Sequence, residues 1–287
     1  MGKEETGFIF KTVHALMAAR VSFFAVAIAL LLMNVHATTE NQPGEAFNFS
    51  YSGNTGPNKW GNLNPKFSAC SHGKLQSPID IVKEKAVLNK KLKPLTRRYY
   101  PANVTLVDNG FNVEVHYGKN VGVLIVDGKN YTLKQMHWHS PSEHRINGVQ
   151  YDAELHLVHM ADDGNFSVVA ILYRLGHADP IVAQIQKKLD ELENEVRAGH
   201  GDAHIVLGTV NTKKLMRRTR KYYRYVGSLT TPPCSQNVIW HILGKVRSIS
   251  KEQVKALKAP LKSTCKNNSR PVQALNGRQI ELYDELH

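Results

Sequence analysis

The sequence predicts a β-dominated α+β domain. Short segments in which polar and apolar residues alternate dominate the chain, and most of them end at Gly- or Asn-containing turns. Helical periodicity is confined to two segments in the second half. No segment repeats at a fixed period, and no Gly/Ser-rich or Pro-rich linker divides the sequence. We therefore expect residues 38–287 to form one domain, a size that single all-β folds reach.

The alternating segments predict strands because successive side chains of a strand point to opposite faces. Two turns are predicted by Asn147-Gly148 and Asp163-Gly164, since both pairs suit the tight connections of hairpins. The predicted strands cover residues 103–107, 112–116, 121–126, 131–139, 152–159 and 168–175.

Two helices follow these strands. Asp179-Pro180 supplies an N-cap and a first-turn proline. Apolar residues then recur with helical spacing, at Ile181, Ile185, Leu189, Leu192 and Val196. A second helix is expected to begin at Ser250, whose spacing to Gln253 resembles a capping box, and to end before Pro260.

Residues 1–37 differ from the rest of the chain and predict a secretory signal peptide. Basic residues precede an apolar run of 13 residues at 21–33, and residues 35–37 offer small side chains for cleavage. The run is shorter than the ~20 residues that a membrane-spanning helix needs. An uncleaved anchor is the alternative. Residues 1–6 also match a myristoylation pattern, but the apolar run favours export.

Other features agree with a secretory route, ending outside the cell, in the apoplast, or in a plastid reached by that route. The three cysteines are too few for a disulfide scaffold, although one bridge suits an oxidising compartment. Five Asn-x-Ser/Thr sequons are candidate glycosylation sites. They begin at Asn48, Asn103, Asn130, Asn165 and Asn267.

The chain is strongly basic. Its formal charge is +13, and it falls to +12 without residues 1–37, which contain three basic and two acidic side chains. Basic clusters at 83–93 and 217–221 could attract polyanions, which leaves a polyanion-binding surface protein as one reading. Because no nucleic-acid motif is present, a solvated basic face is the better interpretation, and we expect neither a nucleic-acid partner nor a membrane partner after signal cleavage.

Three histidines predict a metal site. His137 and His139 share one face of a predicted strand, and an antiparallel neighbour can bring His156 beside them. Three imidazoles suit a catalytic zinc, which keeps a fourth position for water, whereas a structural zinc closes that position with another side chain. A lone histidine is more often an ordinary surface or core residue, but the third histidine and its neighbours favour metal binding.

Gln135 and Glu154 strengthen this prediction. Each lies two residues before a ligand and therefore on the same face of its strand. A metal-bound imidazole usually donates its other N–H to a carboxylate or carbonyl, which fixes the tautomer. We expect Gln135 and Glu154 to accept such hydrogen bonds.

Several segments together resemble one family. The stretches at 135–144, 154–159 and 227–233 are similar to those of the alpha-class carbonic anhydrases, especially the plant-type secreted members. The resemblance also includes residues 49–53, 76–79 and 270–273, so it covers nearly the whole mature chain. It implies a large, mostly antiparallel, twisted central sheet with peripheral helices and the metal in a conical cleft.

The resemblance also implies an activity: reversible hydration of carbon dioxide to bicarbonate and a proton by zinc-bound hydroxide. In the family a threonine accepts the hydroxide's proton and donates its own to a glutamate, and the matching residues are Thr230 and Glu143. Without the resemblance they would read as a turn residue and a loop carboxylate. Weak ester hydrolysis would be a side activity of the same hydroxide.

Further residues take roles only through this resemblance. Thr231 matches a polar contact for bicarbonate, and the backbone carbonyl of Asn268 matches an acceptor for His139. The family's disulfide corresponds to Cys70 and Cys234, which leaves Cys265 free or available for an intermolecular bond. The carbon dioxide pocket corresponds to Val158, Val168, Leu229 and Trp240, each of which could equally be ordinary core.

One position departs from the family. Fast members use a histidine near the cleft mouth to export the proton, and aligning Asp108-Asn109-Gly110 puts Phe111 there. We expect an enzyme with slow proton transfer that relies on buffer or on another group, such as Tyr51, through water. Phe111 also favours the alternative of a storage or binding protein with this fold and weak or lost catalysis. We expect a monomer or a homodimer.

Overall fold

The computed structural model describes residues 49–118, 121–199 and 203–287. The predicted signal peptide at 1–37 and the sequon residue Asn48 lie outside the described residues. Within the described part of the chain, no helix is both long and apolar enough to cross a membrane.

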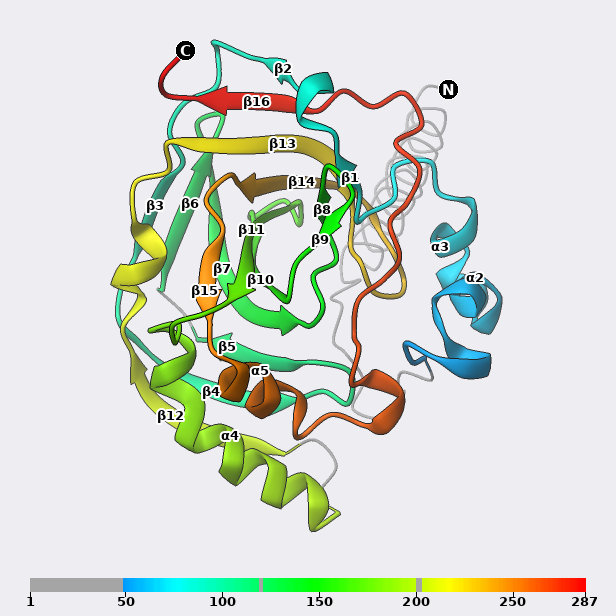
Figure 1. The fold of residues 1–287 in the computed structure, drawn as a ribbon, viewed down its shortest axis with the longest axis vertical. Helices are drawn as coiled ribbons and strands as arrows, with labels where there is room; N and C mark the ends of the chain where they lie inside the picture. The colour runs from blue at the N-terminus through cyan, green and yellow to red at the C-terminus, as the bar shows by residue number, and fades with distance from the viewer. Residues whose placement is uncertain (1–48, 119–120, 200–202) are drawn as a thin grey trace, which may run out of the picture. The chain divides into compact units, whose positions relative to one another are not determined.

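A 13-stranded sheet organises the described residues (Figure 1). Its neighbours are antiparallel except for three parallel pairs, β11 with β14, β11 with β15, and β16 with β2. This confirms the predicted β-dominated fold with a mostly antiparallel sheet. The main path runs β12 (His204–Val210), β4 (Ala102–Asp108), β5 (Val113–Tyr117), β7 (Lys129–His139), β10 (Ala153–Met160), β11 (Phe166–Leu175), β14 (Gln236–Leu243), β13 (Lys221–Ser228), β16 (Glu281–Asp284) and β2 (Val87–Leu88).

Shorter strands complete the sheets. Off the main path, β3 (Thr96–Tyr99) pairs with β6 (Gly122–Val126), which also pairs with β7, and β15 (Arg247–Ile249) pairs with β11. A separate small sheet contains β1 (Asp80–Ile81), β8 (Arg145–Ile146) and β9 (Val149–Gln150). The predicted Asn147-Gly148 turn joins β8 to β9, and both of its residues have positive φ.

The central strands are buried on both faces. In β10, Leu155 and Leu157 belong to one apolar cluster, whereas Val158 belongs to another. In β11, Val169 and Val168 divide in the same way. Since alternate residues of a strand point to opposite faces, the two clusters lie on opposite faces of these central strands.

Two helices cover the face that carries the first cluster (Figure 1). The predicted helices are present as α4 (Val182–Arg197) and α5 (Lys251–Lys258). Asp179 Oδ1 accepts from the N–H groups of Ile181 and Val182, and the Ser250 capping box is formed. Short helices lie elsewhere: η1 (Gly53–Thr55), η2 (Pro57–Lys59), α2 (Trp60–Leu63), η3 (Pro65–Phe67), α3 (Ala69–His72), η4 (Lys83–Lys85), η5 (Thr212–Met216) and η6 (Ser263–Cys265).

Candidate metal centre

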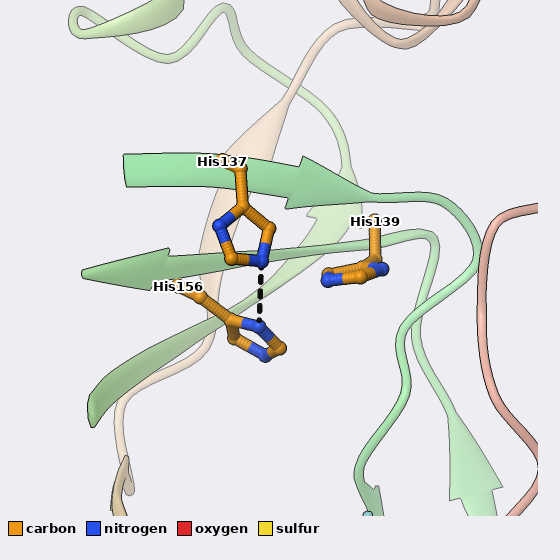
Figure 2. A group of neighbouring side chains, drawn as sticks. All are labelled: His137, His139 and His156. Atoms are coloured by element: carbon orange, nitrogen blue, oxygen red, sulfur yellow. Dashed lines mark hydrogen bonds between the residues drawn. The ribbon is translucent and has the colours of Figure 1, made fainter. Parts of the chain in front are cut away.

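Two central strands bring the three predicted histidines together. His137 and His139 lie on β7, and the antiparallel register pairs His156 of β10 with His137 and Glu154 with His139. Directly opposed residues share a face, so all three rings meet on one side of the sheet, as Figure 2 shows. One nitrogen of each ring lies within 4.8 Å of the others, and all three side chains are buried. We call this group the histidine cage.

The outward nitrogen of each ring faces a hydrogen-bond acceptor. His137 Nδ1 lies 2.7 Å from Gln135 Oε1, and His139 Nδ1 lies 2.5 Å from the backbone oxygen of Asn268. His156 Nε2 lies 2.8 Å from Glu154 Oε1. These acceptors fix the proton on the outward nitrogens, so the inward nitrogens present lone pairs.

The inward nitrogens fit a cation. His139 Nε2 is buried with no hydrogen-bond partner among the described residues. His137 Nε2 and His156 Nδ1 lie 3.3 Å apart, the contact drawn in Figure 2, and with both outward protons in place neither can donate to the other. Burial lowers the pKa of all three rings, that of His139 to about 4, so they are neutral at pH 7. Neutral imidazoles converging on one point suit Zn²⁺.

Glu154 connects the cage to the chain behind it. Its Oε1 accepts from His156 and from His144 Nδ1 at 2.6 Å, and its Oε2 accepts from the backbone N–H groups of Glu143 and His144. Burial opposes ionisation, but His144 and His156 hold the pKa of Glu154 well below its usual value. With both oxygens fully used, the neighbouring group of His144, Glu154 and His156 is a hydrogen-bond network and not a second metal site.

Sequence reasoning gave His144 no role. Its Nε2 lies 2.7 Å from the hydroxyl of Tyr225, which is 2.8 Å from Ser77 Oγ. The ring also lies against Trp240, with centroids 4.8 Å apart. His144 therefore locks Glu154, and through it the ring of His156. The residue lies outside any regular alternation, so only the folded chain reveals this contact.

Glu143 and Thr230 meet beside the cage. Glu143 Oε1 accepts from the backbone N–H of Arg270 at 2.9 Å, and Oε2 lies 3.6 Å from His139 Nε2. Burial raises the pKa of Glu143 to about 7, while a contact with the Thr230 hydroxyl opposes that rise. Glu143 Oε2 is buried and accepts no hydrogen bond of ordinary geometry from the described residues. A cation in the cage would favour the ionised carboxylate.

A cavity of about 170 Å³ opens over the cage. Every residue proposed for substrate contact lines it, together with His137, His156, Gln135 and Thr230. Sequence reasoning missed Asn112, Glu114 and Phe166; period-2 alternation could have found Phe166, which lies two residues before Val168 on β11. The predicted substrate-contact residues in the lining are Val158, Val168, Leu229, Thr231 and Trp240.

Phe111 also lines this cavity, and its ring packs on Phe49 with centroids 4.8 Å apart. The hydroxyl of Tyr51 is buried without a hydrogen-bond partner in the part of the chain that the structure describes, and burial raises its pKa well above 10. On β5, Glu114 lies opposite His137 and forms an ion pair with His116, which lies opposite Gln135. The hydrogen bond that His116 donates to the Glu114 carboxylate raises the pKa of His116.

The loop with Thr230 is tied to the amino-terminal region. Cys70 and Cys234 form a disulfide, as the resemblance implied, and Cys234 N donates to the Thr231 carbonyl at 2.8 Å. Cys265 is free and buried. The sequon residues within the described part of the chain are exposed: Asn103, Asn130, Asn165 and Asn267.

The fold and site define a β-sheet protein with three buried histidines that could hold a metal ion, beside a small, partly apolar cavity. A model of the eukaryotic-type carbonic anhydrase family matches residues 55–284. The chain belongs to this family, whose alpha-class members are zinc enzymes that hydrate carbon dioxide.

Relatives of two kinds are similar to the chain. Alpha carbonic anhydrase 7 of Arabidopsis thaliana is 37% identical over 92% of this chain and 94% of its own length. Dioscorin dioA3 of Dioscorea japonica is 36% identical over 83% and 87%. A crystal structure of dioscorin complexed with ascorbate has a TM-score of 0.78 at 35% identity, covering 82% of this chain and 98% of that one.

Proposed function

We propose that the protein interconverts carbon dioxide and bicarbonate, with Zn²⁺ held by His137 Nε2, His139 Nε2 and His156 Nδ1. When bound, zinc supplies a Lewis acid that makes a coordinated water acidic enough to ionise near neutral pH. Gln135, Glu154 and the Asn268 carbonyl fix the three tautomers and the ring orientations.

Thr230 and Glu143 orient the nucleophile. The ionised carboxylate of Glu143 accepts a hydrogen bond from the Thr230 hydroxyl. The threonine oxygen then accepts a hydrogen bond from the attacking group. A lone pair of that group then faces the substrate. The backbone N–H of Arg270 holds the carboxylate in place from its other oxygen.

The cavity wall suits a small nonpolar substrate. Val158, Val168, Leu229 and Trp240 line one region without offering a strong acceptor toward it, and Thr231 supplies a polar contact for the bicarbonate product. Carbon dioxide needs no leaving group and no general acid. A cavity of about 170 Å³ admits a molecule of that size more readily than a large ester.

Proton export is the slow step of this proposal. Phe111 cannot carry a proton, and the raised pKa of Tyr51 makes it a poor carrier as well. The proton therefore passes through water to buffer, and turnover depends on buffer concentration.

The observation that best supports the activity is the convergence of three lone-pair nitrogens in a buried cage. We would measure zinc content and stopped-flow carbon dioxide hydration on the purified mature protein and on His156→Ala. We expect one zinc per wild-type chain with rapid hydration, and loss of both in the variant. His204→Ala, an exposed histidine on β12, is the control and should keep both.

A storage or binding protein is the second candidate function, favoured by the similarity to dioscorins and by Phe111. In that case the wild-type protein would bind zinc without measurable hydration. The complete set of ligands and the paired Thr230 and Glu143 favour the enzyme.

We further propose passage through the secretory pathway, ending outside the cell, in the apoplast, or in a plastid reached by that route, with residues 1–37 removed and residues 38–287 forming the carbonic anhydrase domain. The disulfide and the four exposed sequon residues support this route. The proposed state is a monomer or a homodimer, which sedimentation of the mature protein would decide.

A further inference from the structure

A second cavity, of about 760 Å³, lies at the far ends of β13 and β14 from Thr230. It is walled by the segments around residues 178–180, 214–221 and 243–248. Among the described residues, seven basic side chains line it and only one acidic one, Asp179. We call it the basic groove; its basic residues are Lys214, Arg217, Arg218, Arg220, Lys221, Lys245 and Arg247.

Part of this charge has no counter-charge. Arg218 and Arg220 pair with Glu285, Lys221 pairs with Asp284, and Arg247 lies 4.0 Å from Asp179. The side chains of Lys214, Arg217 and Lys245 are exposed, and no acidic group among the described residues pairs with them. Such an excess of one sign in a hollow focuses the field and attracts anions.

A buried arginine adds charge behind the wall. Arg97 is only 7% exposed, and its Nη2 donates to the Arg217 carbonyl and to Thr219 Oγ1. Its Nε and Nη1 atoms are buried without a partner among the described residues. Burial lowers the pKa of Arg97, and the nearby Arg247 lowers it further. Arg97 lies behind the lining residues, so it adds to the positive field of the groove without contacting a ligand there.

We propose that the basic groove binds an acidic polysaccharide by contacting the uronate carboxylates of the sugar chain. Arginine forks match carboxylates in two-point contacts, and arginine is the main cation of the groove. No Phe, Tyr, Trp or His is in the lining, so the groove lacks the stacking platform that single-stranded nucleic acids use. The disulfide indicates an oxidising compartment, where acidic polysaccharides are accessible partners.

The groove is separate from the histidine cage. Lys221 and Ser228 are the two ends of β13, and seven steps of roughly 3.3 Å place them about 23 Å apart. Binding in the groove therefore leaves the cage open to small molecules. A groove variant should lose the polysaccharide without losing zinc or hydration.

The test uses the mature protein and a linear oligomer of 1,4-linked galacturonic acid, with binding measured calorimetrically at low and at high salt. We expect wild-type affinity to fall at least tenfold with salt. Arg217→Glu with Lys245→Glu should weaken binding at least tenfold at low salt. The matched control, Lys59→Glu with Lys134→Glu, reverses two exposed lysines outside the groove and should weaken it less than threefold.

Three outcomes would overturn the proposal. One is an equal loss in the control pair, which would trace binding to net charge alone. Another is equal binding of the fully methyl-esterified oligomer, which has no carboxylate charge. The third is tighter binding of single-stranded DNA of equal charge. Thermal unfolding checks that both double variants fold. If the groove variant does not fold, the neutral double variant Arg217→Gln with Lys245→Gln replaces it.

Discussion

The two ends of β13 and β14 differ in the burial and the sign of their charged groups. Near Thr230, most ionisable groups are buried and hydrogen-bonded, while His139 Nε2 is buried without a partner among the described residues. Near Lys221, the charges are exposed and largely of one sign. Burial lowers the pKa of the cage histidines, that of His139 to about 4, and so keeps these rings neutral at pH 7. One sheet thus has buried, hydrogen-bonded groups at one end of these strands and a surplus of cationic side chains at the other.

The largest effect that separates the two ends is expected from Thr230→Val, which removes a hydroxyl at nearly constant volume. Hydration should fall roughly 100-fold, the usual loss when one positioned hydrogen-bonding group at a reacting centre is removed. Zinc content and oligouronate binding should stay unchanged. Stopped-flow hydration and metal analysis measure these outcomes. The matched Thr231→Val should lose less than tenfold, and equal losses would contradict the assignment of Thr230.

Phe111→His should have a smaller effect, in the opposite direction. An imidazole at the cavity gives the proton a carrier near neutral pH, so turnover in weak buffer should rise about tenfold, and less in concentrated buffer. Phe111→Ala opens the same space without a carrier and should bring no gain. If wild-type turnover is already very fast in weak buffer and the histidine adds nothing, proton export is not the slow step.

The smallest effect is expected from Glu114→Gln on the cage side. The Glu114 hydrogen bond raises the pKa of His116, so the substitution should lower that pKa, as an NMR titration would show. A raised pKa contributes stability that is fully present below the unfolded value of about 6.5 and is lost as the pH rises through the folded value. Urea unfolding should therefore separate the two proteins more at pH 6 than at pH 9, and the reverse order would contradict the pairing.

The central part of the fold follows from local patterns. Strands β4, β5, β6, β7, β10 and β11 lie within two residues of their predicted bounds, because each is a short run rich in β-branched and aromatic residues or alternates with a period of two. The carboxyl-terminal strands were not assigned. In β13, Tyr222 and Tyr223 are adjacent and both buried, so no polar residue marks an exposed face. Short strands such as β2 and β15 depend on their partners across the sheet.

The site also has a part that local sequence patterns predict and a part that depends on distant contacts. The cage follows from two facts visible in the sequence, the His-x-His spacing and the strand turn that returns His156. His144 and Arg270 could not be found from local patterns, since their contacts with Glu154 and Glu143 join segments distant along the chain. The basic cluster at 217–221 was visible, but its meeting with Lys245 and Arg247 depends on the end of β14 and the start of β15.

The disulfide makes the loop with Thr230 and Thr231 sensitive to where the chain is produced. Cys70 and Cys234 are 164 residues apart, and the bridge holds the segment with Thr230 and Thr231 to the amino-terminal region. A chain made in the reducing cytosol of an expression host would assemble its imidazoles on the sheet while this segment stayed untethered. Preparations from different hosts could then bind equal amounts of zinc and still differ in turnover. Mild oxidation, which forms the disulfide, would make the turnover of the two preparations equal.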